Sequence, residues 1–323
     1  MAFVTRYGSF WGMLPQTSGK IQFVAPSATY TVEGRATYLA HDSNSGDSPE
    51  YALLTLNQAI TNATADSGDV IVLLPGAHSW TATQTISKAG ITITGIPGAA
   101  PLWGSRMPAI GSRAGTSITT STAVTNVLTI TAADVEISYL HVIPVLGAAG
   151  IKPSAAADRL YVHDCTFYMV TATDSATTGM DGTWTGTTTT LDDVVVRNCY
   201  FFVRDNQGPA IRMQGTTLDF MVENSTFKLV GDTAWDDCIE FVSASLGTTF
   251  RDCDFLQRSS GTAMSDAIDI AGATIDGSST CLRCYFAVGS DALEVANVAD
   301  CQNAENYLMQ AAANVGGTLI LST

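Results

Sequence analysis

The chain has 323 residues, a formal net charge of −15, and 15 basic against 30 acidic side chains. Only 14% of the residues are charged, whereas 46% are hydrophobic, which is ample for a core and argues against intrinsic disorder. A nucleic-acid partner is not expected, because phosphate binding needs clustered Lys or Arg and the sequence has no such cluster. A membrane partner is not expected either, because no run reaches the roughly 18 apolar residues of a spanning segment.

Residues 1–35 are predicted to form an N-terminal arm that the core does not need. Phe3, Tyr7, Phe10 and Trp11 make this stretch apolar. Exposed apolar segments commonly mark attachment sites, so the arm is expected to tether the protein to a larger particle or to sister subunits. An irregular cap folded over the domain is the alternative. The arm lacks the features of a Sec signal peptide, so we expect synthesis in a cytoplasm without Sec export.

A capping segment is predicted at residues 36–68. Residues 51–60 have apolar side chains at helical spacing without Gly or Pro, and residues 47–50 form a plausible helix start. We therefore expect a helix at about residues 51–64. A stack of strands leaves unpaired backbone groups at its first strand, and such a helix would close that open end. The first buried strand is expected within residues 68–76, which end in a Pro-Gly turn, and further strands within 85–95.

One short strand, ending in a bend, then recurs six times between residues 135 and 286. The copies are separated by 25 to 34 residues, an irregular period that is typical of stacked supersecondary units with variable loops. Aligned on the bend, the copies share three apolar columns. These columns are Ile137, Val162, Val196, Val222, Phe250, Cys281; Leu140, Cys165, Cys199, Ser225, Cys253, Cys284; and Val142, Phe167, Phe201, Phe227, Phe255, Phe286.

A second short strand is expected between the copies. Its members are residues 118–120, 151–152, 180–181, 211–213, 239–241, 268–270 and 293–295. Coils that hold several short strands and no crossover helix predict an all-β fold, namely a single-stranded parallel β-helix over residues 69–300. Residues 301–323 are expected to form a C-terminal cap or strand. In such a stack, equivalent side chains lie about 4.8 Å apart, so the Phe column becomes an interior ladder.

The bend itself carries polar residues in four copies. Asp164, Asn198, Asn224 and Asp252 can bond to the nearby backbone and tolerate left-handed geometry. Arg283 interrupts this column, which predicts a different bend in the last copy.

The cysteines are interpreted as reduced structural thiols, since free Cys is a small residue that is usually buried. Cys281 and Cys284 have the spacing of half a zinc site, but both fall in core columns and no second pair follows. We therefore expect neither a metal nor a cofactor.

The segment from Leu56 to Gly95 resembles the opening of right-handed parallel β-helix proteins of the pectate-lyase-like superfamily. Upstream, residues 23–27 and 42–53 resemble the start of β-helix proteins encoded by tailed bacteriophages. The resemblance covers about residues 20–300. It implies the fold more strongly than an activity, because the superfamily includes lyases, hydrolases, tailspikes and inert virion proteins.

An outward acidic column on the second strand is the candidate catalytic site. It consists of Glu240, Asp269 and Glu294, flanked by Asp237, Asp266 and Asp291. Two such carboxyl groups could act as the acid and the base or nucleophile of a glycoside hydrolase. A solvated strand face, a bound cation or a subunit contact are the alternatives, and Arg212 is expected to form a surface ion pair with Glu240. The solvated face is favoured, because the Arg pattern of pectate lyases and the Asp motifs of polygalacturonases are absent.

Three tryptophans, Trp103, Trp184 and Trp235, lie in the loops between coils. Exposed aromatic rings can form sugar-binding platforms, but they are also enriched at protein interfaces. We favour the interface interpretation.

These observations predict a virion structural protein, of the capsid decoration or cement type, that acts by contacts with capsid or other virion proteins. A homotrimer is expected. The first alternative is a tailspike that binds or cleaves host surface polysaccharide, and the second is a carbohydrate-active lyase or hydrolase.

Overall fold

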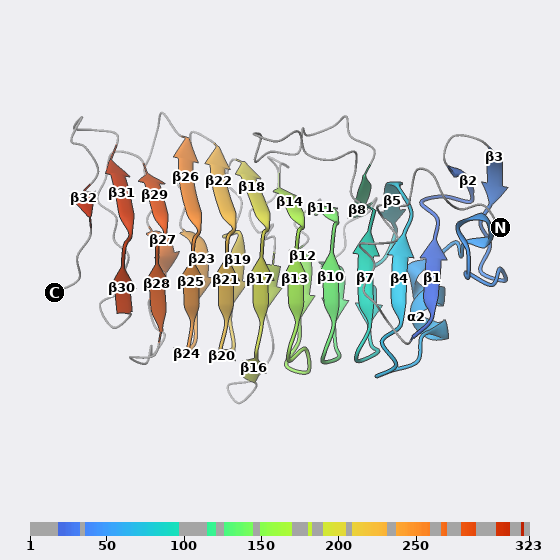
Figure 1. The fold of residues 1–323 in the computed structure, drawn as a ribbon, viewed down its shortest axis with the longest axis horizontal. Helices are drawn as coiled ribbons and strands as arrows, with labels where there is room; N and C mark the ends of the chain where they lie inside the picture. Colours follow the sequence, from blue (N-terminus) through green and yellow to red (C-terminus); the bar gives the residue numbers. More distant parts are fainter. Residues whose placement is uncertain are drawn as a thin grey trace.

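The computed structural model describes residues 19–32, 36–96, 115–120, 126–144, 149–169, 180–182, 190–204, 209–230, 237–258, 266–269, 279–288, 302–310 and 318–319. Within these residues the chain forms a right-handed parallel β-helix, as the sequence predicts. Figure 1 shows successive coils lying side by side from the N-terminal end to the C-terminal end. Neither of the two described helices has the length and apolar content of a membrane span.

Three long sheets form the faces of the stack. Sheet A consists, in spatial order, of β1 (Ile21–Val24), β4 (Val70–Leu73), β7 (Thr92–Gly95), β10 (Glu136–Ser138), β13 (Tyr161–His163), β17 (Val195–Arg197), β21 (Met221–Glu223), β25 (Thr249–Arg251), β28 (Thr280–Leu282) and β30 (Gln302–Ala304). Sheet B consists of β5 (Gly76–Trp80), β8 (Thr116–Thr120), β11 (His141–Ile143), β14 (Thr166–Met169), β18 (Tyr200–Arg204), β22 (Thr226–Val230), β26 (Asp254–Arg258), β29 (Tyr285–Val288), β31 (Tyr307–Gln310) and β32 (Thr318–Leu319). Sheet C consists of β6 (Gln84–Ile86), β9 (Asn126–Ile130), β12 (Ala149–Pro153), β15 (Met180–Gly182), β19 (Ile211–Met213), β23 (Asp237–Phe241) and β27 (Asp266–Asp269).

Two smaller sheets complete the described strands. One joins β16 (Thr190–Asp192), β20 (Thr216–Leu218) and β24 (Ser245–Leu246) in parallel, and the other is an antiparallel hairpin of β2 (Thr29–Val32) and β3 (Ala36–Leu39). In the long sheets, neighbouring strands pair in parallel except β32, which is antiparallel to β31.

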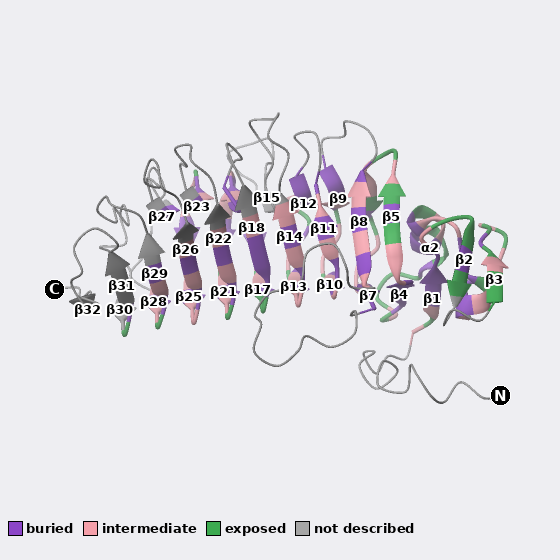
Figure 2. Cartoon of the chain, turned by 90° about the horizontal axis from the view of Figure 1, so that it is seen from above, coloured by how far each residue is buried: buried purple, intermediate pink, exposed green. Residues whose placement is uncertain are grey.

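The six-fold repeat is confirmed as the end of a sheet A strand, a bend and the start of a sheet B strand. The strand register places Val162 opposite Val196 in sheet A and Phe167 opposite Phe201 in sheet B. From Phe167 to Phe286 the rings stack with centroids 4.6–5.0 Å apart and planes within 4–6°. The rings are at most 2% exposed, and burying each one contributes about 1.5–3 kcal/mol. Buried residues therefore recur at the same step in successive coils (Figure 2).

The bend between sheets A and B is left-handed in every repeat. Its φ angles lie between 48° and 56° for Tyr139, Asp164, Asn198, Asn224, Asp252, Arg283 and Glu305. The expected different bend at Arg283 is therefore wrong. The backbone N–H of Asp252 donates to the carbonyl of Leu282 at 3.0 Å, and the Arg283 guanidinium holds the Asp252 carboxylate. These contacts offset the roughly 1–2 kcal/mol that a left-handed conformation costs a non-glycine residue.

A second left-handed column precedes the sheet A strands, which the sequence did not indicate. It contains Asp134, Arg159, Asp193, Asp219 and Gly247. Most of these residues donate a backbone N–H to a carbonyl of the next coil, so each turn positions its neighbour. At Gly247 a side chain would be strained, because φ is 69° and the Asp219 carboxylate would have to move away from an added Cβ.

The N-terminal end is closed by a shorter helix than the expected 51–64. Residues Pro49–Tyr51 form a 3-10 turn (η1), and the α-helix α2 spans only Leu56–Asn62. Leu53 exchanges backbone hydrogen bonds with β1, which requires extended backbone there. The Asp42 carboxylate then accepts the N–H groups of Leu54 and Thr55, which delays the start of the helix. Leu56, Ala59 and Ile60 of α2 are buried against the core, as a cap requires.

The stack extends beyond the expected range of 69–300. Strand β1, within residues 1–35, pairs in parallel with β4, and β30 and β31 continue the stack beyond residue 300. The outer face of β1 and β4 is covered by the β2–β3 hairpin, which gives a second small core around Phe23, Tyr30 and Val72.

One register assignment also differs. Ile118 of β8 stands opposite Val142 and so continues the Phe column in sheet B, while Leu128 of β9 stands opposite Ile151 in sheet C. Both strands are short and rich in β-branched residues, so the sequence pattern did not show which of them belongs to sheet B and which to sheet C.

The described cysteines are buried thiols, namely Cys165, Cys199, Cys238, Cys253, Cys281 and Cys284. Their environment is structural, because the Cys199 Sγ lies 3.3 Å from the carbonyl of Arg197. Burial raises the pKa of the Cys199 thiol well above its ordinary value. Cys301 lies outside the described residues.

Candidate functional site

The predicted acidic column lies on sheet C. The register places Asp237 opposite Asp266, and Glu240 opposite Asp269, so the stacking of these positions is confirmed. Arg212 precedes Glu240 in the same column. Glu294 and Asp291 lie outside the described residues.

The predicted ion pair between Arg212 and Glu240 is present. The Arg212 Nε lies 3.0 Å from the Glu240 Oε2, although this contact does not have hydrogen-bond geometry. The two side chains are 37% and 23% exposed, so the pair contributes at most about 1 kcal/mol. An arginine partner favours an ionised carboxylate, which suits a base or nucleophile but not a proton donor. Glu240 therefore has the surroundings of a surface ion pair rather than those of a general acid.

The predicted interface aromatics cannot be placed. Phe3, Tyr7, Phe10, Trp11, Trp103, Trp184 and Trp235 all lie outside the described residues. Their role in subunit contact remains a prediction.

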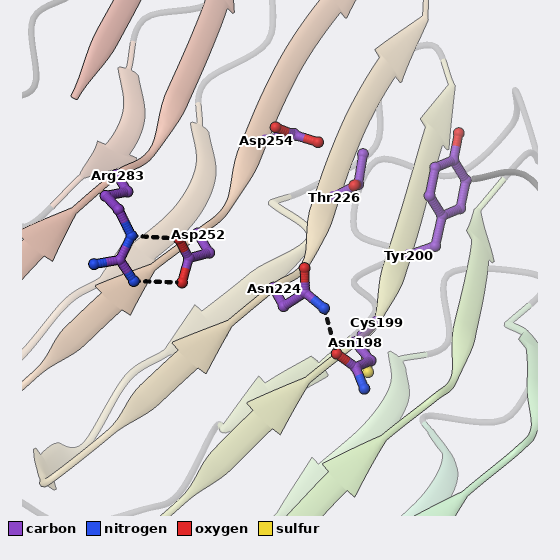
Figure 3. A pocket seen from close by; sticks show the side chains of 8 residues that line it. All are labelled: Asn198, Cys199, Tyr200, Asn224, Thr226, Asp252, Asp254 and Arg283. Atoms are coloured by element: carbon purple, nitrogen blue, oxygen red, sulfur yellow. Dashed lines mark hydrogen bonds and ion pairs between the residues drawn. The ribbon is translucent and has the colours of Figure 1, made fainter. Parts of the chain in front are cut away.

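A polar groove lies at the bend between sheets A and B, and the sequence analysis did not identify it. Its volume is about 600 Å³, and it is lined by Asn198, Cys199, Tyr200, Asn224, Thr226, Asp252, Asp254 and Arg283. Figure 3 shows these side chains in two rows, one at the bend and one at the start of the sheet B strands. Because every repeat has the same bend, both rows follow the axis of the stack.

The bend row is a ladder of side-chain hydrogen bonds. The Asn224 amide donates to the Asn198 Oδ1 at 2.6 Å, and the Asn198 amide donates to the Asp164 Oδ1 at 3.4 Å. In the next coil, Asp252 instead accepts two 2.7 Å hydrogen bonds from Arg283. These bonds hold the pKa of the Asp252 carboxyl below its ordinary value. The amide ladder therefore ends at Asn224, inside the groove.

The strand row consists of Tyr200, Thr226 and Asp254, which occupy equivalent positions on β18, β22 and β26. Tyr200 is only 9% exposed, and its hydroxyl is buried without a hydrogen-bond partner. Burial raises the pKa of Tyr200 to about 12. The sequence could have revealed this row, because its residues always lie two positions after the bend. Their types vary, however, whereas the adjacent Phe column is regular and drew the attention.

A histidine cluster lies on the outer face of sheet A. The His163 Nδ1 is 2.7 Å from the Asp164 Oδ2, and its Nε2 is 3.0 Å from the Glu136 Oε1. The imidazole also stacks on Tyr161, with ring centroids 4.3 Å apart. Burial alone would lower the pKa of His163, but the two carboxylates outweigh it and raise the pKa to about 9. The imidazolium therefore links two coils at neutral pH, and it is unsuited to act as a base there.

One acidic cluster has the spacing of a possible cation site. Carboxylate oxygens of Asp192, Asp193 and Asp219 lie within 4.8 Å of one another, at the turn before sheet A. Such oxygens suit a hard cation such as Ca²⁺. Exposed carboxylates at a turn are also common without an ion, so this cluster alone assigns no function.

No protein-family model matches the chain, and no curated protein matches it at a significant level. Among solved structures, the chain is similar to a pectin methylesterase from Erwinia chrysanthemi, with 12% identity and a TM-score of 0.48 over 91% of this chain and 90% of that chain. It is also similar to pectate lyase Pel9A, with 14% identity and a TM-score of 0.38 over 85% and 65% of the two chains. A third similar structure is ORF18 of Geobacillus virus E2, with 13% identity and a TM-score of 0.36 over 81% and 59%. At this level of similarity, the fold assignment rests on the strand register described above.

Proposed function

We propose that the chain is a structural protein of a bacteriophage particle, in which a stiff β-helix makes contacts with neighbouring subunits or capsid proteins. The observation that carries this proposal is the use of charged surface side chains as links between coils. Adjacent coils are joined by the pairs Asp134–Arg159, Glu136–His163, Arg197–Glu223, Arg212–Glu240, Glu223–Arg251 and Asp252–Arg283.

These pairs favour a mechanical role over a catalytic one. An exposed pair contributes less than about 1 kcal/mol, so these links add modestly to a stack that is held mainly by parallel strand pairing and the buried Phe ladder. One of these pairs also engages Glu240, a candidate catalytic carboxylate. The sequence similarity of residues 42–53 to phage β-helix proteins supports the particle as the location.

The proposal also names the segments that would contact the capsid and the sister subunits. The part of the predicted arm that precedes β1 would attach the protein, as capsid decoration or cement, and the loop tryptophans would contribute to a homotrimer. Mass spectrometry of gradient-purified particles, from the phage that encodes the chain, tests the location. The proposal predicts the protein in fixed proportion to the major capsid protein. Recovery only from the soluble lysate would overturn it.

Binding of a surface polysaccharide is the second candidate function, and the polar groove favours it. Amide, hydroxyl and carboxylate groups in a row are the donors and acceptors that sugar hydroxyls require. Cleavage is tested separately, by measuring reducing ends released from host polysaccharide by wild type, Asp269→Asn and Glu240→Gln. We expect no release by any of the three proteins. Release that disappears in the variants would establish a glycosidase or lyase instead.

A further inference from the structure

We infer that the groove at the bend between sheets A and B binds an extended, uncharged glycan chain along the axis of the stack. This inference rests on the second candidate function and names its site and its ligand class. The groove is distinct from the acidic column, which lies on sheet C.

The first argument is hydrogen-bonding capacity that the protein leaves unused. Among the described contacts, the Asn224 Oδ1 accepts no hydrogen bond at the end of the amide ladder. The Thr226 hydroxyl has no partner among these contacts either, and the Tyr200 hydroxyl is buried and unsatisfied. Sugar hydroxyls both donate and accept, and can therefore satisfy the accessible Asn224 and Thr226 groups, while Tyr200 lines the groove beside them.

The second argument is the repeat distance. Equivalent side chains on adjacent coils are about 4.8 Å apart, which is close to the advance per sugar in an extended glycan chain. Each coil therefore offers one side chain at the bend and one on the strand, and successive coils offer such a pair to successive sugars. Figure 3 shows both rows running across neighbouring strands of the stack. A single small ligand would not need such a repeated arrangement.

The third argument is charge. The groove holds two carboxylates, Asp252 and Asp254, and one guanidinium, Arg283, which is already engaged by Asp252. Its formal charge is therefore −1, in a chain whose net charge is −15. A polyanionic glycan would be repelled, whereas a neutral glycan would not.

The fourth argument is an aromatic surface on the same face of sheet B. Phe202 lies two residues beyond Tyr200, and its ring stacks on Tyr168 with centroids 5.0 Å apart and planes within 19°. Both rings are partly exposed. Flat rings of this kind accept the C–H face of a sugar while the polar rows bind its hydroxyl groups.

Affinity electrophoresis of the full chain in gels that contain dextran, mannan, galactan or polygalacturonate tests the inference. We expect retardation by at least one neutral glycan and none by polygalacturonate. In Asn224→Ala and in Thr226→Val, affinity for that glycan should fall about fivefold, which corresponds to one lost hydrogen bond. Thr166→Val is the matched control, because it changes the equivalent threonine on β14 outside the groove, and its affinity should be unchanged.

The outcomes separate the inference from the function on which it rests. Equal binding of a neutral glycan by wild type and by both groove variants would overturn the groove but leave glycan binding intact. Retardation by polygalacturonate alone would overturn the uncharged ligand class. No retardation by any glycan would overturn both glycan binding and the groove. Circular dichroism spectra of all variants must match wild type, the melting temperature of Thr226→Val must also match, and Thr226→Ser provides a further variant that should retain binding.

Discussion

At the scale of single residues, the stack is joined by side chains that contact the next coil. His163 is one example, with its side chain 14% exposed between the carboxylates of Glu136 and Asp164. Tyr139 and Tyr161 flank the same imidazole. Because the folded state raises the pKa of His163 to about 9, protonation and folding are coupled.

The first prediction concerns pH. The stabilisation from His163 should be complete below its unfolded pKa of about 6.5 and should be lost as the pH rises through 9. The difference in free energy of unfolding between wild type and His163→Gln should therefore shrink by on the order of 2 kcal/mol between pH 6 and pH 9.5. Urea denaturation at several pH values measures it.

His41→Gln is the control for this experiment, because His41 is exposed and its imidazole hydrogen-bonds to nearby Ser43. A pH-independent difference for His163→Gln would contradict the account. Comparing variants also removes the opposite effect of His78, whose burial lowers its pKa.

The second prediction concerns the Phe ladder. Phe227→Ala should lower the free energy of unfolding by about 3–5 kcal/mol, because it opens a cavity between two stacked rings. Phe202→Ala, on the outer face of the neighbouring strand, should cost much less. Chemical denaturation of the two variants compares them, and equal losses would contradict the larger stabilisation assigned to the ladder.

At the scale of elements, the left-handed bend defines each coil. Asn224 adopts φ 48°, a region that β-branched residues strongly disfavour. The same bend is kept by Arg283, so the neighbouring coil determines the geometry more than residue type does.

The third prediction tests this bend. Asn224→Val should destabilise the protein by about 1–3 kcal/mol, because valine is strained at positive φ. Asn224→Gly should cost less, since glycine adopts this conformation freely and loses only the amide contact with Asn198. Thermal melting ranks the variants, and the opposite order would contradict a left-handed bend.

The elements show how much the sequence could predict. The columns through Phe227 and Val222 were predictable, because a buried face repeated at a fixed distance from the bend leaves a direct pattern. The boundary at Leu56 was not, because it depends on long-range pairing of Leu53 with β1. The bend at Arg283 was also missed, because its ion pair with Asp252 spans two coils.

The candidate site divides in the same way. The stacking of Glu240 and Asp269 was predictable because it follows from strand register alone. The groove was not, because Asn198 and Asn224 were explained by backbone conformation before their side chains were considered. These asparagines line one surface with Thr226 only because of the angle at which sheets A and B meet, and the sequence does not give that angle.

At the scale of the whole molecule, the N-terminal end must be closed. Helix α2 and the segment around Leu53 cover the core and the backbone edge of β1. A β-sheet edge without such cover pairs readily with other chains.

The fourth prediction tests this cover. Leu56→Asp buries a charge at a fully buried position and should displace α2 from the end of the stack. Size-exclusion chromatography should then show aggregates at concentrations where wild type gives a single species. Asn57→Asp, on the exposed side of α2, is the control and should behave as wild type does.

The central proposal is that this β-helix is a building unit of a phage particle. Cryo-electron microscopy of intact particles tests it most directly, with particles lacking the encoding gene as the comparison. The account predicts rod-shaped density that fits the three-sheet stack, occurs at symmetry-related positions and is missing from the deletion particles. Identical density in both particle preparations, with the protein detected only in solution, would contradict it.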